Sequence, residues 1–327
     1  MSEFSGQDVC ILGGTGTIGT ALIERLLQDN PARIRCVSND EYSLWKTEKK
    51  FGAMSHENPL RYVLKDIRNR EAMRELLRGV DVLYMLACYK HVQYVEYSPQ
   101  EAIEVNINGN KTVIEEVLQN ARVQKVVNAS TDKVCYANNT YGLSKHIVEK
   151  LIEWAQFYRP VSEQITKFSN VRFGNVLMSR GSVLEHWFNP ETKEIQLRDP
   201  FHRRFIMPTR EAIDLLLKCT TQMKGGETFI YKMPVVQMGD LAEVVSELTK
   251  KPVVRVPVML GEQEHQWLMT KDESIRRIED DDSFTIHRNN PFVSPSEYST
   301  ENCTLYTKSE IEVMIEEEFG YGCVPRF

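Results

Sequence analysis

The sequence feature that most constrains this chain is a glycine-rich turn near its N-terminus. Residues 12–19 read Leu-Gly-Gly-Thr-Gly-Thr-Ile-Gly, and they join the apolar run Asp8–Leu12 to a helical pattern. Gly13, Gly16 and Gly19 therefore stand three residues apart where a strand turns into a helix. Glycine permits a tight turn, and the N-terminus of a helix presents free N–H groups to a phosphate. This context predicts a dinucleotide-binding loop formed by Gly13, Thr15, Gly16, Thr17, Ile18 and Gly19.

The rest of the first half alternates short apolar runs with helical periodicity, which is the pattern of strand–helix–strand units. Strands are expected at Asp8–Leu12, Arg33–Ser38, Leu60–Leu64, Asp81–Leu86, Gln124–Ala129 and Lys167–Phe173. Helices are expected at Ile18–Gln28, Arg70–Leu77, Pro99–Asn120 and Tyr141–Phe157. Such alternation predicts an α/β fold with a doubly wound parallel sheet of the Rossmann type.

The rhythm changes after about Asn175. The stretch Asn189–Arg210 is rich in Pro, Arg and Asp, and Glu262–Glu301 is polar and irregular. A length of 327 residues suits about two domains. We therefore expect a dinucleotide-binding Rossmann domain and a smaller substrate-binding lobe. The expected domain spans residues 1–175 and is completed by about 204–240, and the lobe spans about 176–203 and 241–327.

Composition excludes several classes of protein. With 42% hydrophobic and 26% charged residues, the chain is an ordinary globular one. The 40 basic and 46 acidic side chains give a net charge of −6 with neither sign concentrated, so no nucleic acid or membrane partner is expected. No apolar run approaches the roughly 20 residues of a membrane helix. Seven widely spaced cysteines fit neither paired disulfides nor a CxxC metal site, so we expect reduced thiols and a cytoplasmic protein.

The choice of dinucleotide depends on the end of the second strand, where an acid that binds the ribose is expected. The chain reads Cys-Val-Ser-Asn over residues 36–39, with no acid and no arginine at that position. The missing acid favours a 2′-phosphate, for which Ser38, Asn39 and Lys46 are the available partners. NADP is therefore the expected cofactor, and NAD, with Asp40 on the ribose, is the alternative.

Candidate reacting groups follow the fifth strand. Asp132 and Lys133 end the run Ser130-Thr131-Asp132-Lys133, and Tyr141 and Lys145 lie at the start of the next expected helix. Four residues apart, Tyr141 and Lys145 share a helical face, where the ammonium can lower the pKa of the phenol and hold the nicotinamide ribose. Tyr141 is thus a candidate base for a hydroxyl group at the carboxyl edge of the sheet, where open α/β folds bind ligands.

These residues together resemble the extended short-chain dehydrogenases/reductases, from about Asp8 to about Asp282. Within them, the chain resembles the soluble UDP-N-acetylglucosamine 4,6-dehydratases that invert C5 and serve polysaccharide and pseudaminic acid biosynthesis. The similarity lies in five motifs: Ser130–Lys133, Lys90-His91-Val92, Arg172-Phe173-Gly174-Asn175-Val176, Ser179–Val183 and Lys232-Met233-Pro234.

The resemblance implies a lyase that gives a UDP-4-keto-6-deoxy-N-acetylhexosamine through a hydride relay on NADP, without a metal. Lys133 would be the base at C5, Asp132 the acid at the departing 6-hydroxyl, and Thr131 a hydrogen-bond partner near the 4-hydroxyl. A base at neutral pH needs a lowered pKa at Lys133, from burial or from cations such as Lys145.

The resemblance also implies the binding residues and a homo-oligomeric assembly. The cofactor would contact Asp66, Ile67, Leu86 and Ala87, besides Tyr141 and Lys145. The nucleotide sugar would contact Lys90, Asn175, Arg180, Val183 and Arg204, with the arginines suited to phosphate oxygens. Asn106 has two equal interpretations, a site residue and a polar cap over the strand ends.

Three departures from the family pattern leave alternatives open. Residues 259–263 read Met-Leu-Gly-Glu-Gln where relatives carry Arg-Pro-Gly-Glu-Lys, Asn39 replaces an arginine, and Val134-Cys135-Tyr136 replaces small residues. A GDP-linked or other nucleotide-linked sugar therefore remains an alternative substrate, and retention an alternative to inversion. A 4-epimerase or reductase would use Tyr141 and Lys145 equally well but does not need Asp132 with Lys133. A non-catalytic dinucleotide sensor would not need the Tyr–Lys pair.

Overall fold

The central feature of the computed structural model, which describes residues 3–119, 122–158, 166–259 and 261–320, is one large sheet. Its strand order among the described residues is β14-β15-β10-β6-β5-β4-β1-β2-β3. The strands are β1 (Asp8–Leu12), β2 (Arg33–Ser38), β3 (Leu60–Leu64), β4 (Val82–Met85), β5 (Lys125–Thr131), β6 (Lys167–Phe173), β10 (Thr228–Tyr231), β14 (Arg277–Glu279) and β15 (Ser283–Ile286). All neighbours from β3 to β10 pair in parallel, whereas β15 and β14 add antiparallel edges.

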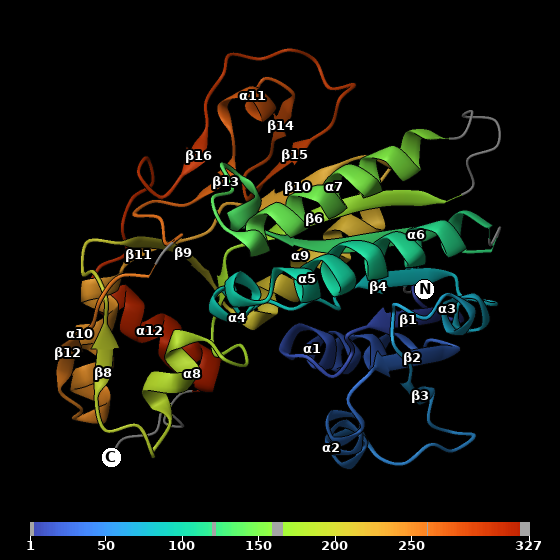
Figure 1. Cartoon of the computed structure of the whole chain (residues 1–327), viewed down its shortest axis with the longest axis horizontal. Coiled ribbons are helices and arrows are strands. Elements are labelled where there is room, and N and C mark those ends of the chain that lie inside the picture. Colours follow the sequence, from blue (N-terminus) through green and yellow to red (C-terminus); the bar gives the residue numbers. More distant parts are fainter. Residues whose placement is uncertain (1–2, 120–121, 159–165, 260, 321–327) are drawn as a thin grey trace.

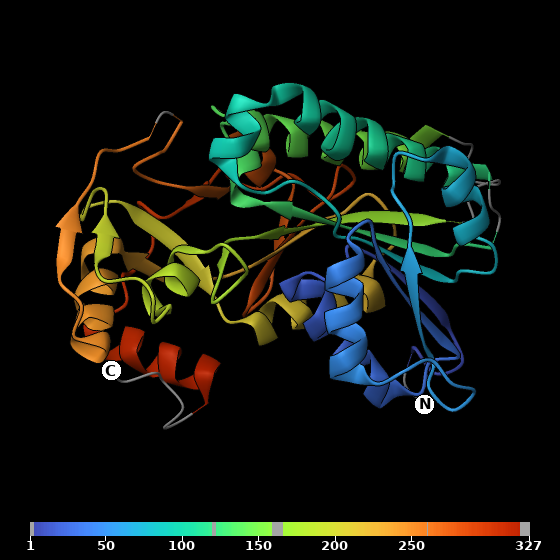
Figure 2. The ribbon, with the colours of Figure 1, turned by 60° about the horizontal axis from the view of Figure 1, so that its bottom comes forward.

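Helices cover both faces of this sheet, as Figures 1 and 2 show. On one face, α1 and α9 pack through Ile23 and Leu216 in one core; on the other, α6 and α7 pack through Val113 and Val148 in a second core. The helices of this domain are α1 (Thr17–Leu26), α2 (Glu41–Phe51), α3 (Arg70–Leu76), α4 (Val92–Tyr97), α5 (Pro99–Ala102), α6 (Asn110–Gln119), α7 (Thr140–Tyr158) and α9 (Thr209–Gln222), with short turns at Leu27–Asp29 and Asp132–Val134. The expected doubly wound Rossmann sheet is confirmed.

A second lobe lies beside the carboxyl edge of the sheet and has its own core. Leu184, Leu241 and Ile315 pack there at the junction of three helices. Its helices are α8 (Val183–Phe188), α10 (Met238–Thr249) and α12 (Lys308–Phe319). Its strands are β7 (Asn175–Val176), β8 (Ile195–Leu197), β9 (Arg203–Met207), β11 (Val235–Gln237) and β12 (Val253–Arg255). A further hairpin region contains β13 (Trp267–Met269), α11 (Lys271–Ser274) and β16 (Tyr298–Ser299).

The division of the chain differs from expectation in two places. We expected residues 241–327 in the lobe, but β14 and β15 pair with β10 and extend the large sheet. We expected residues 204–240 to complete the Rossmann domain, and α9 and β10 do so, whereas β9 pairs with β11 and with β7 in a separate sheet. Strands this short contain too few residues for a periodic pattern to indicate where they pair.

The expected helix Pro99–Asn120 also differs. The chain forms α5, then a π-helical segment at Ile103–Gly109, then α6, and residue 120 lies outside the described residues. The π-helical segment inserts an extra residue into the turn, which brings Asn106 into the protein interior with no exposed surface.

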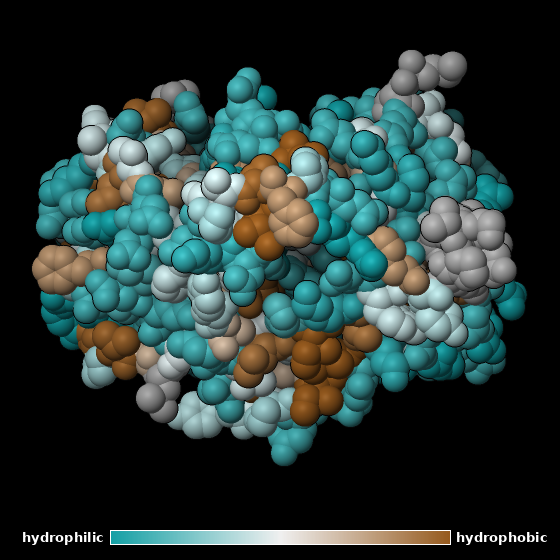
Figure 3. All heavy atoms as spheres, turned by 90° about the horizontal axis from the view of Figure 1, so that it is seen from above, coloured by the Kyte–Doolittle hydropathy of each residue, from teal (hydrophilic) through white to brown (hydrophobic). Residues whose placement is uncertain are grey.

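The outer surface seen in Figure 3 is mostly hydrophilic, with separate hydrophobic patches. Among the helices of the described ranges, none combines the length and apolar character needed to cross a bilayer.

Candidate active site

A cavity of about 1350 Å³ opens where the carboxyl ends of the parallel strands face the second lobe. It exceeds the 300–1,000 Å³ typical of a site for one small ligand, so it has room for a dinucleotide and a second molecule. The residues predicted for the site that line it are Gly13, Thr15, Gly16, Thr17, Ile18, Gly19, Ser38, Asn39, Asp66, Ile67, Leu86, Ala87, Lys90, Thr131, Lys133, Tyr141, Lys145, Asn175, Arg180, Val183 and Arg204. Asp132 is buried behind this wall, and Lys46 is not part of the lining formed by the described residues.

The glycine loop has the shape that a dinucleotide requires. Gly13 has a φ of +83°, and a Cβ there would stand 2.9 Å from the backbone nitrogen of Ala87. A Cβ at Gly19 would stand 2.6 Å from the carbonyl oxygen of Gly13. Gly16 precedes α1, whose first turn contains no acidic residue. These residues therefore fit a pyrophosphate at the N-terminus of α1.

At the end of β2 the polar side chains bind one another. Thr15 Oγ1 donates to Ser38 Oγ at 3.1 Å, and Asn39 Nδ2 donates to Asp66 Oδ2 at 3.3 Å. Asp40 caps α2 by accepting from the backbone nitrogen of Tyr42. Lys46 places its ammonium 4.6 Å from the centre of the Tyr42 ring.

Asp132 and Lys133 form a pair at the end of β5. Lys133 Nζ donates to Asp132 Oδ1 at 3.0 Å, and Thr131 Oγ1 donates to the same oxygen at 2.8 Å. The carboxylate of Asp132 has no exposed side-chain surface, and its Oδ2 has no hydrogen-bond partner among the described residues. A buried polar atom without a partner is costly, so this oxygen is a strained feature of the site.

Tyr141 and Lys145 lie one turn apart at the start of α7 and are both buried, as the spacing predicts. Burial raises the pKa of Tyr141 well above its usual value of 10, and negative charge at Cys88 and Asp132 raises it further, while a hydrogen bond with Thr131 lowers it. The sequence predicted a lowered pKa instead. The apolar contacts of Tyr141 with Val95 and Ala102 account for the difference, because an apolar environment disfavours the phenolate.

Asn106, in the π-helical segment, forms a hydrogen bond with α7. Its side chain donates to Ser144 Oγ at 3.1 Å and to the carbonyl oxygen of Tyr89 at 3.0 Å, and it accepts from the Tyr89 nitrogen. Ser144 directly precedes Lys145 in α7. Of the two interpretations, the internal polar bridge between the loop after β4 and α7 is the one that these contacts describe.

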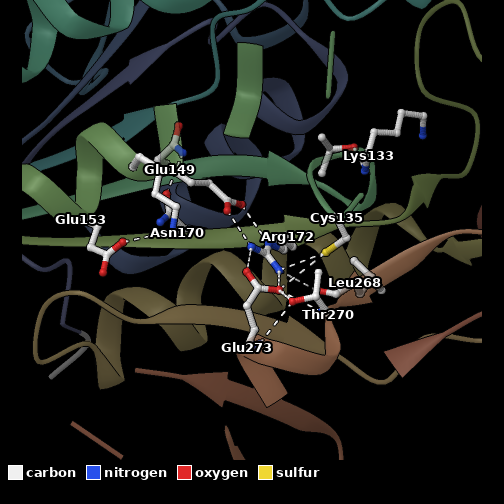
Figure 4. Close-up of polar contacts among 12 residues, drawn as sticks. Lys133, Cys135, Glu149, Glu153, Asn170, Arg172, Leu268, Thr270 and Glu273 are labelled. Atoms are coloured by element: carbon white, nitrogen blue, oxygen red, sulfur yellow. Dashed lines mark hydrogen bonds and ion pairs between the residues drawn. The ribbon is translucent and has the colours of Figure 1, made fainter. Parts of the chain in front are cut away.

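Behind the pair of Asp132 and Lys133 lies a buried ionic cluster, drawn in Figure 4, centred on Arg172 of β6. Its guanidinium binds Glu149 of α7 at 2.7 and 2.9 Å and Glu273 of α11 at 2.6 and 3.0 Å. It also donates to the carbonyl oxygen of Leu268 at 2.9 Å and lies 3.3 Å from Cys135 Sγ. The cluster thus joins the turn of Lys133, the helix of Tyr141 and the β13–α11 segment.

On the lobe side, cations face one carboxylate. Arg204 Nη2 lies 3.4 Å from Glu262 Oε1, and Arg198 Nε lies 3.7 Å from Glu262 Oε2. His202 Nδ1 lies 3.0 Å from Arg204 Nη2. The amide of Asn175 is bound to the carbonyl oxygen of Phe205 at 2.8 Å.

Arg198 and Glu262 also line the cavity, although no motif in the sequence indicates this position for either residue. Arg198 belongs to the Arg-rich stretch already noted, and Glu262 belongs to the segment that departs from the family pattern. Among the described residues, no group of three or more His, Cys, Asp or Glu side chains is placed to hold a metal ion.

The comparisons with known proteins agree with this geometry. A family model described as polysaccharide biosynthesis protein matches residues 9–288. An uncharacterized membrane protein of Methanocaldococcus jannaschii is 32% identical, over 96% of this chain and 96% of that protein. A UDP-N-acetylglucosamine 4,6-dehydratase (inverting) of Campylobacter jejuni is 31% identical, over 86% of this chain and 83% of the relative. A UDP-glucose 4-epimerase of Rickettsia akari is 33% identical, over 83% of this chain and 80% of the relative.

Solved structures show the same fold. Pen from Bacillus thuringiensis is 34% identical with a TM-score of 0.91, covering 97% of this chain and 99% of that one. DesIV from Streptomyces venezuelae, a dTDP-glucose 4,6-dehydratase with NAD bound, is 19% identical with a TM-score of 0.67, covering 79% and 86%. WbmF from Bordetella bronchiseptica, in complex with NAD⁺ and UDP, is 19% identical with a TM-score of 0.63, covering 79% and 83%. The chain therefore belongs to the polysaccharide biosynthesis protein family, within the extended short-chain dehydrogenases/reductases.

Proposed function

We propose that this protein is a nucleotide-sugar 4,6-dehydratase, a lyase that converts UDP-N-acetylglucosamine to a UDP-4-keto-6-deoxy-N-acetylhexosamine. The observation that supports this most is the contact between Asp132 and Lys133 at 3.0 Å beside the glycine loop and the Tyr141–Lys145 pair. Oxidation at C4 alone needs only the Tyr–Lys pair, whereas elimination of water across C5 and C6 needs an added acid and base.

We propose that the cofactor is NADP, which would lie against the glycine loop with its nicotinamide ribose at Lys145. Bound NADP would supply the hydride chemistry, from C4 of the sugar to C6, and C5 would regain a proton as the hydride returns. Tyr141 would take the proton of the 4-hydroxyl, which requires that the positive charge of Lys145 and of the bound cofactor offset the burial that raises the pKa of Tyr141. The resulting ketone makes the C5 proton acidic.

Elimination is the task of Asp132 and Lys133. Transfer of a proton from Lys133 Nζ to Asp132 Oδ1, across their hydrogen bond, leaves a neutral amine beside a neutral acid. Lys133 then removes the C5 proton, and Asp132 gives its proton to the 6-hydroxyl, which leaves as water. Such acid–base help is worth about 10² to 10⁴ in rate. Arg204, Asn175, Lys90 and Val183 would contact the nucleotide sugar.

The test is incubation of the purified protein with UDP-N-acetylglucosamine, and separately with the GDP-linked sugar, followed by NMR. We expect a new 6-methyl signal with the UDP-linked sugar. A methyl signal with the GDP-linked sugar alone would show that the substrate is GDP-linked and not UDP-linked. The relative from Rickettsia akari, a UDP-glucose 4-epimerase, supports a second candidate function, that of a 4-epimerase. An epimerase would yield the C4 epimer with its 6-hydroxyl retained and no methyl signal.

We propose inversion at C5, because Lys133 stands where the inverting dehydratases have their base. The expected first product is the L-arabino 4-keto sugar. Proton couplings at C5, read before spontaneous epimerisation, distinguish it from the D-xylo sugar, and a D-xylo first product would show retention.

We also propose a homo-oligomer in the cytoplasm. Support for assembly comes from apolar side chains exposed on α4 and α7, namely Tyr94, Tyr97, Leu143, Ile147 and Trp154. Support for a reducing compartment comes from the free thiols of Cys10, Cys36, Cys88, Cys135, Cys219 and Cys303. Light scattering during size-exclusion chromatography measures the assembly directly, and a monomer would contradict it.

A further inference from the structure

Arg180, which the family resemblance assigns to the nucleotide sugar, contacts the dinucleotide side of the cavity. It belongs to the loop between β7 and α8, in the second lobe, yet its backbone nitrogen donates to Thr17 Oγ1 of the glycine loop at 3.0 Å. Its Nη1 atom lies 3.4 Å from Ser43 Oγ, in the first turn of α2. The loop therefore crosses from the lobe to the dinucleotide side of the cavity, where Figure 1 shows it approaching α1.

The first turn of α2 follows the end of β2, which is where a Rossmann fold distinguishes the two dinucleotides. An acid there binds the ribose of NAD, and an arginine there accommodates the 2′-phosphate of NADP. Neither residue is present at the end of β2 in this chain, which reads Ser38-Asn39 before Asp40.

The other polar side chains at this strand end already have partners. Asn39 is bound to Asp66, and Asp40 accepts from Tyr42 and Ser43 as the cap of α2. Lys46 has its ammonium over the ring of Tyr42 and is not part of the cavity lining formed by the described residues. Ser38, Asn39 and Arg180 line the cavity.

We propose that Arg180 is the side chain that binds the 2′-phosphate of NADP, in place of an arginine at the end of β2. The inference rests on the proposed function, since it concerns the cofactor of that site. A guanidinium suits phosphate oxygens because its N–H groups form a planar fork. It also supplies a positive charge next to the carboxylate of Asp40, which by itself would repel a phosphate. Ser38 Oγ accepts from Thr15 Oγ1 and from the Asp40 nitrogen, so its own hydroxyl would add a donor on the strand side.

This assignment means that the second lobe contributes to cofactor selection. An arginine on β2 would act within one domain, whereas Arg180 reaches the 2′-phosphate from the loop that leads into α8. Binding of NADP would therefore hold that loop against the glycine loop, whereas NAD would lack this contact.

The experiment measures dissociation constants of NADP⁺ and NAD⁺ by calorimetry, without nucleotide sugar and after removal of co-purified nucleotide. The proteins are the wild type, Arg180→Gln, Arg180→Lys and Arg210→Gln. Arg210 is a matched control, because its exposed guanidinium on α9 pairs only with Asp214 among the contacts of the described residues. Thermal unfolding of each variant verifies the fold.

We expect the wild type to prefer NADP⁺. Arg180→Gln should raise the dissociation constant of NADP⁺ by about tenfold to a hundredfold, the usual range for loss of a hydrogen bond to a charged group. The dissociation constant of NAD⁺ should change by no more than about twofold. The NADP⁺ affinity of Arg180→Lys should lie between those of the wild type and Arg180→Gln, and the affinity of Arg210→Gln should match that of the wild type.

Three outcomes would overturn the assignment. Equal weakening of NADP⁺ and NAD⁺ would place Arg180 at the shared pyrophosphate. If Arg180→Gln leaves the affinity for NADP⁺ unchanged and Lys46→Met lowers it, Lys46 and not Arg180 binds the 2′-phosphate. A wild type that prefers NAD⁺ would remove 2′-phosphate recognition altogether. Because no sugar is present, these outcomes are independent of the dehydratase test.

Discussion

Tyr141 and Lys133, to which the proposed function gives separate tasks, both line the cavity. Tyr141→Phe removes the group to which we assign the 4-hydroxyl proton, so no nicotinamide absorbance near 340 nm should develop when substrate is added. Lys133→Ala keeps the Tyr–Lys pair, so some oxidation should occur while solvent deuterium no longer enters C5. We expect each variant to lose at least about a hundredfold in product formation. Deuterium exchange at the wild-type rate in Lys133→Ala would remove Lys133 from the mechanism.

Gly142 is the residue where α7 passes closest to the turn of Lys133. A Cβ at this position would lie 2.1 Å from the carbonyl oxygen of Lys133, and that oxygen belongs to backbone that cannot swing aside. The glycine after Tyr141 thus allows the helix and the turn to approach each other.

Gly142→Ala should therefore displace Lys133 relative to Tyr141. Because misplacement by about 1 Å can cost about a hundredfold in rate, we expect a loss of that order in kcat. The glycine loop is remote from the clash, so the dissociation constant of NADP⁺ should change little. A kcat equal to that of the wild type would show that the turn relaxes freely.

At the scale of elements, the N-terminus of α7 is capped from two directions. Asn139 Oδ1 accepts from the backbone nitrogen of Gly142 at 2.9 Å, and Glu96 of α4 accepts from that of Thr140 at 2.8 Å. These contacts satisfy N–H groups that the helix itself leaves free. They also hold the first turn of α7, which contains Tyr141, in place.

Asn139→Ala should cost about 0.5–2 kcal/mol of unfolding free energy, as loss of a cap does, and should also lower kcat. Thr307→Ala is the matched control, since Thr307 caps α12 in the lobe by accepting from the Glu310 nitrogen. It should lose similar stability in chemical denaturation and keep its activity. Equal effects of both changes on kcat would mean that capping acts only through global stability.

At the scale of the whole molecule, Arg172 joins parts of the chain far apart in sequence. Burial by itself would raise the pKa of Glu273. The charge of Arg172 and hydrogen bonds from Arg172 and Thr270 outweigh this effect and lower the pKa from 4.5 to about 2. Because the folded pKa is depressed, this contribution to stability is present above pH 4.5. It is lost as the pH falls from 4.5 towards 2.

Glu273→Gln should therefore be less stable than the wild type near pH 7 and approach it as the pH falls below 4.5. Removal of one partner from a buried ion pair costs about 3–5 kcal/mol, and retention of Glu149 beside Arg172 should keep the loss at or below the low end of this range. Thermal unfolding midpoints from pH 7 to pH 3 measure the difference. A constant gap between the two proteins would contradict the role of the Glu273 charge.

Local patterns were sufficient to predict most of the sheet. Alternating apolar runs and the glycine turn indicated the strands from β1 to β6, because buried parallel strands are nearly continuous apolar segments and glycine marks the turn. The same reasoning missed α2, β10, β14 and β15, and it joined α5 to α6. Edge strands and exposed helices have weak periodicity, and tertiary contacts of Asn106, with Ser144 and Tyr89, decide the π-helical break.

For the site, the sequence by itself determined which chemical groups are available: the glycine loop, the Tyr141–Lys145 spacing and the neighbouring Asp132 and Lys133. Only the tertiary structure decided how these groups are surrounded. Burial raises the pKa of Tyr141, Glu262 faces Arg204, and Arg180 reaches α2 from the other lobe. Spacing along the chain fixes contacts within a helix or a turn. Burial, charge neighbours and contacts between lobes depend on segments that meet only when the chain folds.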